Sequence, residues 1–426
     1  MQASLPYPRQ SISHSLGLFF NRAAFAFLLA VTAFAPVAVG GVEPWALLGV
    51  RLLVTVGAGC WLFSACLRGS LTLPPRPILF TLLAYLTVVM LSTLFSSYTF
   101  GSVQVALNIF IYATAFLLST ALLSSARRRR AFVGVITATA LVMGSYGVLQ
   151  FLGYGWTPTL SPKRVSSFYY NSNHYSGYLA LLTPLSVALL VYTQRAALKG
   201  LYALLSALLL FNLALTFSWG LLAVSVTVVG LLTLWAVRSG RVWRSILATV
   251  SALLIGFAGL AALVSLTPQL YSETLTTRTA EFFNTWVVRS FTARVAIGEA
   301  TFQIIQDHFV LGVGPGNFIY AFTEHRTPQV TNDANLTLHK FVNYSHNDYT
   351  QVASETGLMG LLGFLSFWFV ALRRAKLARG VAHGFTAGLV ALLLHGLSDG
   401  NLTVIPANVC LAFLFVGFVH AAPAFD

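Results

Sequence analysis

The chain has 426 residues, of which 57% are hydrophobic and only 8% are charged. Soluble domains carry roughly 25% charged residues, so this composition and a mean hydropathy of +0.78 exclude a water-soluble globule. The net charge of +14 would indicate nucleic acid binding in a soluble protein. Here the basic residues lie in short loops between apolar runs, so we expect membrane lipids and no nucleic acid as partners.

The apolar runs are close to 20 residues long, the length that crosses ~30 Å of hydrocarbon as a helix. They lack the alternation of an outer-membrane barrel. The first run resembles a signal peptide, but the chain re-enters the membrane repeatedly, so we predict an uncleaved first helix. The sequence therefore predicts an all-α polytopic membrane protein with about twelve transmembrane helices, near 20–40, 45–66, 78–96, 104–124, 131–152, 177–193, 200–217, 219–237, 245–266, 356–372, 382–398 and 403–421.

Residues 267–355 interrupt this pattern, because they are too polar to span a membrane and hold most of the acidic residues. We expect one large extramembrane loop here, between helices nine and ten. The chain is thus divided into helices one to nine over 1–266, this loop, and helices ten to twelve over 356–426.

The basic residues fix the expected orientation. One side holds 16 of the 25, in the N-terminal tail and after the even-numbered helices: Arg9, Arg68, Arg76, Arg127, Arg128, Arg129, Arg130, Arg195, Lys199, Arg238, Arg241, Arg244, Arg373, Arg374, Lys376 and Arg379. The positive-inside rule makes this side cytoplasmic. We therefore expect both termini in the cytoplasm and the large loop on the other side.

A first cluster of polar side chains precedes the sixth predicted helix, at 163–174. It combines cations, amides and aromatic rings, among them Arg164, Asn171 and Asn173. Cations suit phosphate, whereas amides and aromatic rings suit sugars. A polar loop in an aromatic membrane belt has a similar composition, so this segment alone leaves both interpretations open.

A second cluster begins at Arg294, which opens an amphipathic helical pattern. A glycine-rich turn follows at 312–318 and includes Gly314 and Gly316. We do not interpret it as a nucleotide-binding loop, because no strand precedes it and Pro315 interrupts it. A tight turn in which the backbone approaches a ligand or the membrane surface is the expectation.

The third cluster surrounds His346. In a helix, Asn347, Gln351 and Glu355 share one face at i, i+4 and i+8, with Ser345 as the expected N-cap. His346 then lies at the helix start, just outside the membrane. Imidazole titrates near neutral pH and suits proton transfer, although a hydrogen-bonded structural histidine is the alternative.

No metal site is expected. The other histidines of the loop, His308, His325 and His339, lack the i+4 partner that zinc motifs require. The three cysteines, Cys60, Cys66 and Cys410, lie in apolar segments and have neither metal-site spacing nor a disulfide framework.

The fourth cluster lies between the last two predicted helices. Its ionisable residues, His395 and Asp399, are spaced i, i+4. Ionisable residues near the membrane are usually functional or paired, and we expect these two to pair with each other.

At these four clusters the sequence resembles the O-antigen ligase/polymerase family of bacterial envelope glycosyltransferases, in order and across most of the chain. The residues that match the family's motifs are Arg164, Phe168, Asn171 and Asn173; Arg294 and the 312–318 turn; His346, Asn347, Gln351, Glu355 and Gly357; and His395, Asp399, Asn401, Leu402, Pro406 and Ala407. Three positions depart. Phe309 stands where proline is usual and Gly298 where tryptophan is usual, and the third departure bears on the chemistry. The family usually has an arginine after Thr216-Phe217-Ser218, where this chain has Trp219, so either Arg164 or Arg289 substitutes for that cation or the activity is altered.

The resemblance implies a bacterial inner-membrane enzyme with a GT-C-type fold and a periplasmic active site. Such enzymes move a glycan from an undecaprenyl-diphosphate carrier to an acceptor hydroxyl, without metal, nucleotide sugar or other cofactor. It implies His346 as general base, oriented by Asn347 or Glu355, with Arg294 and Arg164 at the diphosphate. The expected substrate-binding residues are Arg164, Asn171, Asn173, Arg289, Asn347, Gln351, Gly314 and Gly316.

Two activities share these motifs. A ligase transfers the glycan to the lipid A-core of lipopolysaccharide, and a polymerase transfers it to a growing polysaccharide on the carrier. We favour the ligase and keep the polymerase as the alternative. A transporter of lipid-linked sugars would also have about twelve helices, but it predicts two similar halves and charges at mid-membrane, which the sequence lacks.

Overall fold

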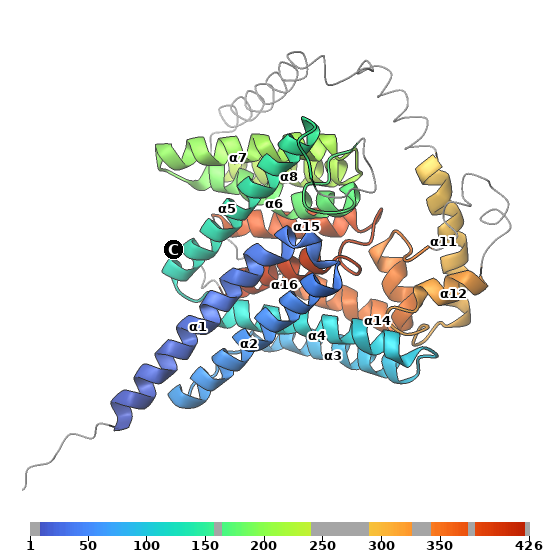
Figure 1. Ribbon diagram of the computed structural model, residues 1–426, viewed down its shortest axis with the longest axis horizontal. Coiled ribbons are helices and arrows are strands. Elements are labelled where there is room, and N and C mark those ends of the chain that lie inside the picture. Colours follow the sequence, from blue (N-terminus) through green and yellow to red (C-terminus); the bar gives the residue numbers. More distant parts are fainter. Residues whose placement is uncertain (1–8, 157–163, 240–288, 326–341, 374–379, 422–426) are drawn as a thin grey trace, which may run out of the picture.

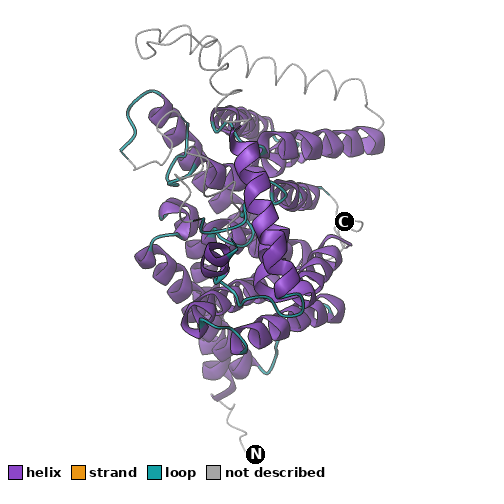
Figure 2. Ribbon diagram, turned by 90° about the vertical axis from the view of Figure 1, so that its right-hand side faces the viewer, coloured by secondary structure: helices purple, strands orange, loops and turns teal. Residues whose placement is uncertain are grey.

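The computed structural model describes residues 9–156, 164–239, 289–325, 342–373 and 380–421. These residues form thirteen α-helices and a short 3-10 helix, Val39–Gly41, without any strand (Figure 2). The α-helices are α1 Arg9–Val37, α2 Pro44–Arg68, α3 Arg76–Leu94, α4 Thr99–Leu122, α5 Ala126–Phe151, α6 Ser172–Tyr192, α7 Ala196–Leu215, α8 Gly220–Ser239, α11 Arg289–Asp307, α12 Phe318–Glu324, α14 Asp348–Arg373, α15 Ala382–His395 and α16 Pro406–Ala421.

Apolar helices lie at the predicted positions wherever the structure describes them. Nine described helices are long and apolar enough to cross a membrane, and α15 and α16 are two shorter apolar helices. The remaining predicted helix, 245–266, lies outside the described residues. The chain is therefore a multi-pass α-helical membrane protein.

The helices pack around α16, which lies at the centre of the bundle (Figure 1). All its residues from Pro406 to His420 are buried, which explains why it is apolar on every face. Its Gly417 permits close approach to α4, since a Cβ there would collide with the Ser119 side chain. The pairs α1–α2, α6–α15 and α3–α14 complete the packing.

Helices α11 and α12 lie at the end of the bundle opposite the start of α1 (Figure 1). The amphipathic pattern predicted from Arg294 is confirmed, because Ala296, Ile297, Ala300 and Ile304 of α11 are buried. They form a small separate core with Phe318 and Phe322 of α12 and with other apolar neighbours.

Helix α14 begins at Asp348 and has a break at Gly357, whose φ of 68° and ψ of −173° are not helical. The segment before the break is polar and yet buried, and it contains the predicted helical face of Gln351 and Glu355. The apolar segment after it begins close to the predicted transmembrane start at 356. The predicted loop also contains α11 and α12 within its described part. The first turns of α14 thereby carry the third polar cluster into the bundle.

Candidate active site

The centre of the candidate site is a pair formed by His346 and Asp399. Nδ1 of His346 lies 3.4 Å from Oδ1 of Asp399. The His346 side chain is 23% exposed and that of Asp399 only 1%, so the imidazole faces outward and the carboxylate lies beneath it. His346 precedes α14 with φ of 55°, a left-handed conformation that costs energy for a residue with a Cβ. The surrounding contacts must therefore hold it in place.

Tyr344 packs against the imidazole and links it to His174. The ring of Tyr344 packs on that of His346 at 4.3 Å between centroids, and its hydroxyl lies 3.1 Å from Nε2 of His174 in α6. Burial and the charge of Asp399 hold the pKa of Tyr344 well above its ordinary value. The phenol therefore stays neutral; its ring packs on the imidazole of His346, and its hydroxyl bonds to His174.

Asp399 stays ionised despite its burial. Burial raises its pKa, but the neighbouring His346, and then the charges of His174 and Arg294, bring the pKa well below the ordinary aspartate value. A carboxylate held charged beneath an imidazole favours the tautomer with the proton on Nδ1. The other ring nitrogen, Nε2, is then the one able to accept a proton.

Arg294 connects the second cluster to this pair. It projects from α11, and its Nε donates to the Ser398 carbonyl at 3.0 Å, one residue before Asp399. Its positive charge acts on Asp399 and on Arg164. A guanidinium therefore lies within electrostatic range of the imidazole–carboxylate pair.

Arg164, from the first cluster, is buried. Its Nε donates to the Thr216 carbonyl at 2.6 Å and its Nη2 to the Phe217 carbonyl at 3.2 Å and to Asn173. Burial lowers the pKa of Arg164 to about 10, while Asp399 raises it and Arg294 lowers it. Arg164 thus remains charged near neutral pH and caps the end of α7.

The predicted amides are used to build the site. The side chain of Asn171 accepts from the Asn173 backbone N–H at 2.8 Å and is the N-cap of α6. Asn347 accepts from the backbone N–H groups of Tyr349 and Thr350. Asn347, and not Ser345, is therefore the N-cap of α14, and no hydrogen bond joins either asparagine side chain to the His346 ring among the described contacts.

Asp348 anchors the loop that carries Asp399. It is fully buried, and its carboxylate accepts from the Leu402 backbone N–H at 2.9 Å and from the Thr403 hydroxyl at 2.7 Å. Its own backbone N–H donates to the Gly396 carbonyl. These bonds join the start of α14 to the loop between α15 and α16.

Glu355 contacts the glycine turn. Gln351 links Glu355 to the residues just before α14, because its side chain donates to Glu355 at 2.8 Å and accepts from the Ser345 backbone N–H at 2.7 Å. Glu355 accepts at 3.5 Å from the backbone N–H of Phe318. The expected shared face of Gln351 and Glu355 is confirmed. No hydrogen bond joins Glu355 or Asn347 to the imidazole among the described contacts, and their role in orienting it stays a prediction.

The glycine turn packs against protein. Gly314 donates its backbone N–H to the Glu355 carbonyl at 2.9 Å, and Gly314 and Gly316 have φ of 102° and 80°. A Cβ on Gly314 would collide with Ser96, and one on Gly316 with Val105 of α4. The expected approach of this backbone to a ligand or membrane surface is thus replaced by docking on neighbouring helices.

We expect Gly314→Ala to destabilise the protein by about 1–3 kcal/mol, because alanine is strained at this φ and collides with Ser96. A lower melting temperature in detergent would check this. The control is Gly298→Ala in α11, where a Cβ meets nothing within 4 Å. Equal melting temperatures for the two variants would contradict the docking role of the turn.

The expected pairing of His395 with Asp399 is wrong. Nε2 of His395 lies 3.2 Å from the Ser218 hydroxyl, and Nδ1 lies 3.2 Å from the Asn401 side chain. Helix α15 ends at His395. The Asp399 backbone N–H still donates to the His395 carbonyl at 3.2 Å, but the two side chains have different partners. Asn401 continues this buried network to Asn408 of α16.

Two further positions were of interest near the expected diphosphate site: Trp219, where the family usually has an arginine, and Arg289. Trp219 is 47% exposed and follows Ser218, the partner of His395. The side chain of Arg289 lies outside the described residues. The sequence offered two arginines to replace the missing cation, Arg164 and Arg289. The structure describes the side chain of Arg164 only.

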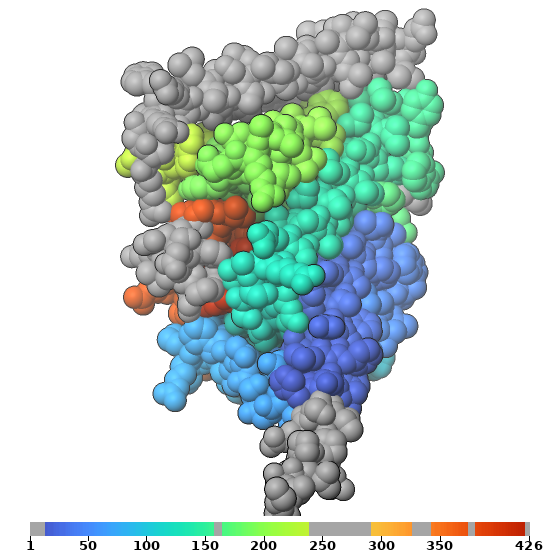
Figure 3. All heavy atoms as spheres, turned by 90° about the vertical axis from the view of Figure 1, so that its left-hand side faces the viewer, coloured from blue at the N-terminus to red at the C-terminus, as the bar shows by residue number. Residues whose placement is uncertain are grey.

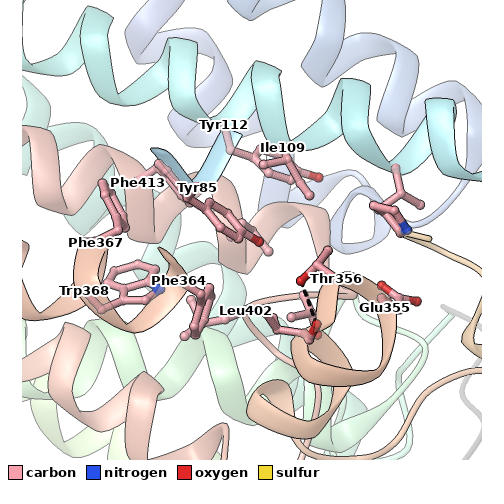
Figure 4. A pocket seen from close by; sticks show the side chains of 15 residues that line it. Tyr85, Ile109, Tyr112, Glu355, Thr356, Phe364, Phe367, Trp368, Leu402 and Phe413 are labelled. Carbon is pink, nitrogen blue, oxygen red and sulfur yellow. Dashed lines mark hydrogen bonds between the residues drawn. The ribbon is translucent and has the colours of Figure 1, made fainter. Parts of the chain in front are cut away.

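A small aromatic cavity lies beside the glycine turn (Figure 4). Its lining comes from α3, α4, α14, α16 and adjoining loops, and includes Tyr85, Tyr112, Phe364, Trp368 and Phe413. Of the predicted site residues only Glu355 lines it, and the His346–Asp399 pair does not. This cavity is therefore separate from the polar cluster.

We expect transfer activity to persist after dialysis against EDTA. No group of three or more histidine, cysteine, aspartate or glutamate side chains among the described residues is arranged to hold a metal ion. An assay with and without added magnesium would check this. A loss of activity that magnesium restores would contradict the expectation.

The structure brings His346, Arg294 and Arg164 together around Asp399, and it places Asn173 beside Arg164. It leaves Gly314, Gly316 and Glu355 as a separate docked segment, with Asn171 and Asn347 as helix caps. Sequence reasoning missed the contribution of Asp399, Tyr344 and His174 to the surroundings of His346. All three lie within the four polar clusters, but the sequence does not show that these clusters are close to one another in space.

These features define a multi-pass membrane protein with ionisable side chains gathered at one end of its helix bundle. Residues 204–365 match the family model described as O-antigen ligase. This match supports the expected O-antigen ligase family and indicates a glycosyltransferase-like enzyme with a glycan ligase or polymerase role. It includes Arg294 and His346 and excludes Arg164 and Asp399. No match among curated proteins was found.

Proposed function

We propose that this protein is an O-antigen ligase, which transfers a glycan from undecaprenyl diphosphate to a hydroxyl of the lipid A-core. The observation that carries the proposal is the convergence of four distant sequence clusters on Asp399. His346 is 3.4 Å away, Arg294 binds the preceding carbonyl, and the charge of Asp399 acts on Arg164. This set of groups suits one reaction, with an anionic leaving group and a base.

In the proposed reaction, Nε2 of His346 takes the proton of the acceptor hydroxyl while Asp399 stabilises the resulting imidazolium. The acceptor oxygen forms a bond to the anomeric carbon of the donor sugar. The bond from that carbon to the phosphate oxygen breaks, and the electron pair leaves with the diphosphate. Attack from the face opposite the leaving group inverts the anomeric centre.

The leaving diphosphate gains negative charge as the bond breaks, so nearby guanidinium groups stabilise the transition state. Arg294 and Arg164 are proposed for this role, because forked N–H donors match phosphate oxygens. Asn173 would position Arg164, and Gln351 and Glu355 would position the start of α14. No metal or nucleotide takes part in this proposal.

We further propose that the protein lies in the bacterial inner membrane with its active site facing the periplasm and both termini in the cytoplasm. The alternation of basic loops along the sequence supports this orientation. A phosphatase reporter that is active only in the periplasm tests it. Fusion after Asp426 is expected to be inactive, and an active fusion would reverse the orientation.

Deletion of the gene in its native host tests the function. Lipopolysaccharide, secreted polysaccharide and carrier-linked glycans would be analysed by gel and mass spectrometry, with rescue by the wild-type gene. Long glycans stranded on the carrier are expected for a ligase. Single repeat units on the carrier or core would instead identify a polymerase, the alternative activity of the same family. Unchanged glycans, in a host without a second such gene, would reject both and favour a transporter.

A further inference from the structure

Three arginines from three helices gather at the end of the bundle opposite the candidate active site. Arg22 belongs to α1, Arg68 is the last residue of α2, and Arg128 lies in the first turn of α5. Helix α1 packs on both α2 and α5, and Figure 3 shows α1 in dark blue beside α5 in teal at this end. A Cβ on Gly17 of α1 would meet the Arg68 side chain at 2.8 Å, and Arg128 contacts Asn21 of the same helix. Arg68 and Arg128 therefore both lie against the helix that carries Arg22.

Arg128 is directed toward α1 by specific contacts. Its guanidinium lies over the ring of Phe25, 5.0 Å from the centroid, and donates to the side chain of Asn21. It also donates to the Leu122 carbonyl at 3.4 Å. Arg127 and Arg130, from the same basic run, are exposed. A simple topology signal requires only basic residues in a loop, so the inward placement of Arg128 needs another explanation.

No carboxylate neutralises this cluster within the described structure. The sequence contains no aspartate or glutamate from residue 44 to 272 or before Glu43. Glu43 itself lies at the start of α2, one helix length away from Arg68. Three like charges at close range repel one another, and an anion bound between them would offset this repulsion.

An exposed apolar surface adjoins the cluster. The Ser64 hydroxyl of α2 donates to the Gly17 carbonyl of α1 at 2.7 Å, which holds the two helices together at this level. Nearby, Phe20 packs on Phe63 at 4.6 Å, while Phe19 and Phe63 stay 62% and 47% exposed. A ligand with a negative headgroup and hydrocarbon chains would contact both surfaces.

We propose that Arg22, Arg68 and Arg128 form a binding site for the phosphodiester headgroup of an anionic phospholipid, whose acyl chains lie along Phe19 and Phe63. Basic clusters between membrane helices bind such headgroups, and forked guanidinium donors match phosphate oxygens. This site is independent of the proposed transfer reaction.

Native mass spectrometry of the purified full chain tests the site, with phosphatidylglycerol as the probe and phosphatidylcholine as the neutral comparison. The double variant Arg68→Ala/Arg128→Ala is compared with Arg127→Ala/Arg130→Ala, which removes the same number of charges from exposed positions. Each arginine contributes ~1 kcal/mol, or about fivefold in affinity. We expect phosphatidylglycerol binding to fall about 25-fold in the first variant and less than about threefold in the second.

Equal losses in the two double variants would overturn the proposal, as would equal retention of the two lipids by the wild type. Displacement of the lipid by millimolar inorganic phosphate would show that the site takes free phosphate and would also overturn it. If the first double variant fails to fold, Arg68→Ala alone, at an exposed side chain, is expected to weaken binding about fivefold. Unchanged binding in that variant would reject the site.

Discussion

Replacing His346 by alanine is expected to lower the rate of glycan transfer by about 10²–10⁴-fold, because a positioned general base contributes this much. The imidazole is held by Asp399 and by the Tyr344 ring, so no other described side chain is placed to replace it. The measurement is the rate of transfer by purified protein in liposomes, at saturating donor. The KM for the donor is expected to change little, since the arginines that bind the diphosphate remain.

The matched control is His308→Ala. His308 lies just after α11 with an exposed side chain, so its loss is expected to leave the transfer rate within about twofold of the wild type. Near-normal turnover of the His346 variant would remove the general base from the mechanism. Equal loss in the two variants would indicate a general effect on the folded protein.

The membrane-spanning helices were predictable because burial in lipid requires long apolar runs, which composition reveals directly. The burial of the first turns of α14 was not, because Asp348, Gln351 and Glu355 are polar. Asp348 and Glu355 find partners in distant segments, Leu402 and Phe318 respectively. A hydropathy pattern counts the cost of burying these groups but not the hydrogen bonds that offset it.

The partner of His346 was missed for a related reason. The i, i+4 spacing of His395 and Asp399 predicted a pair only if a helix continued through both residues. The chain leaves the helix at His395, and the bonds of Asp348 to Leu402 and Thr403 fix the loop beyond it. Contacts between loops far apart in sequence therefore decide where the Asp399 carboxylate points.

The amides illustrate a second limit. Asn171 and Asn347 have the residue type expected for sugar binding, but asparagine is also a preferred N-cap. Both cap helices in the structure. Residue type alone does not separate these roles, whereas the arginines and His346 retain their place in the proposed chemistry because they surround one carboxylate.

Replacing Asp399 by asparagine is expected to lower the rate of transfer by about 10²-fold while the donor KM changes little. The substitution keeps the shape of the side chain but removes the negative charge beneath His346 that stabilises the imidazolium. The pKa of Asp399 lies well below the ordinary value, so in the wild type its charge contributes stability at every pH above the ordinary aspartate pKa of about 3.9. That contribution is lost only as the pH falls below this value toward the folded pKa. Loss of wild-type activity between pH 5 and pH 7, about where imidazole titrates, is therefore not a titration of Asp399.

The control is Asp307→Asn, which alters another histidine–aspartate pair. Oδ2 of Asp307 lies 2.9 Å from Nε2 of His325, but the Asp307 side chain is 64% exposed, and a solvent-exposed pair contributes little. Its rate and pH profile are expected to match the wild type. Melting temperatures in detergent show whether the Asp399→Asn protein is folded at the assay temperature. If it is folded, a changed rate or pH profile reflects the loss of the charge beside His346 and not a loss of stability. A folded variant with wild-type rate and pH profile would show that the buried carboxylate serves the fold and has no part in transfer.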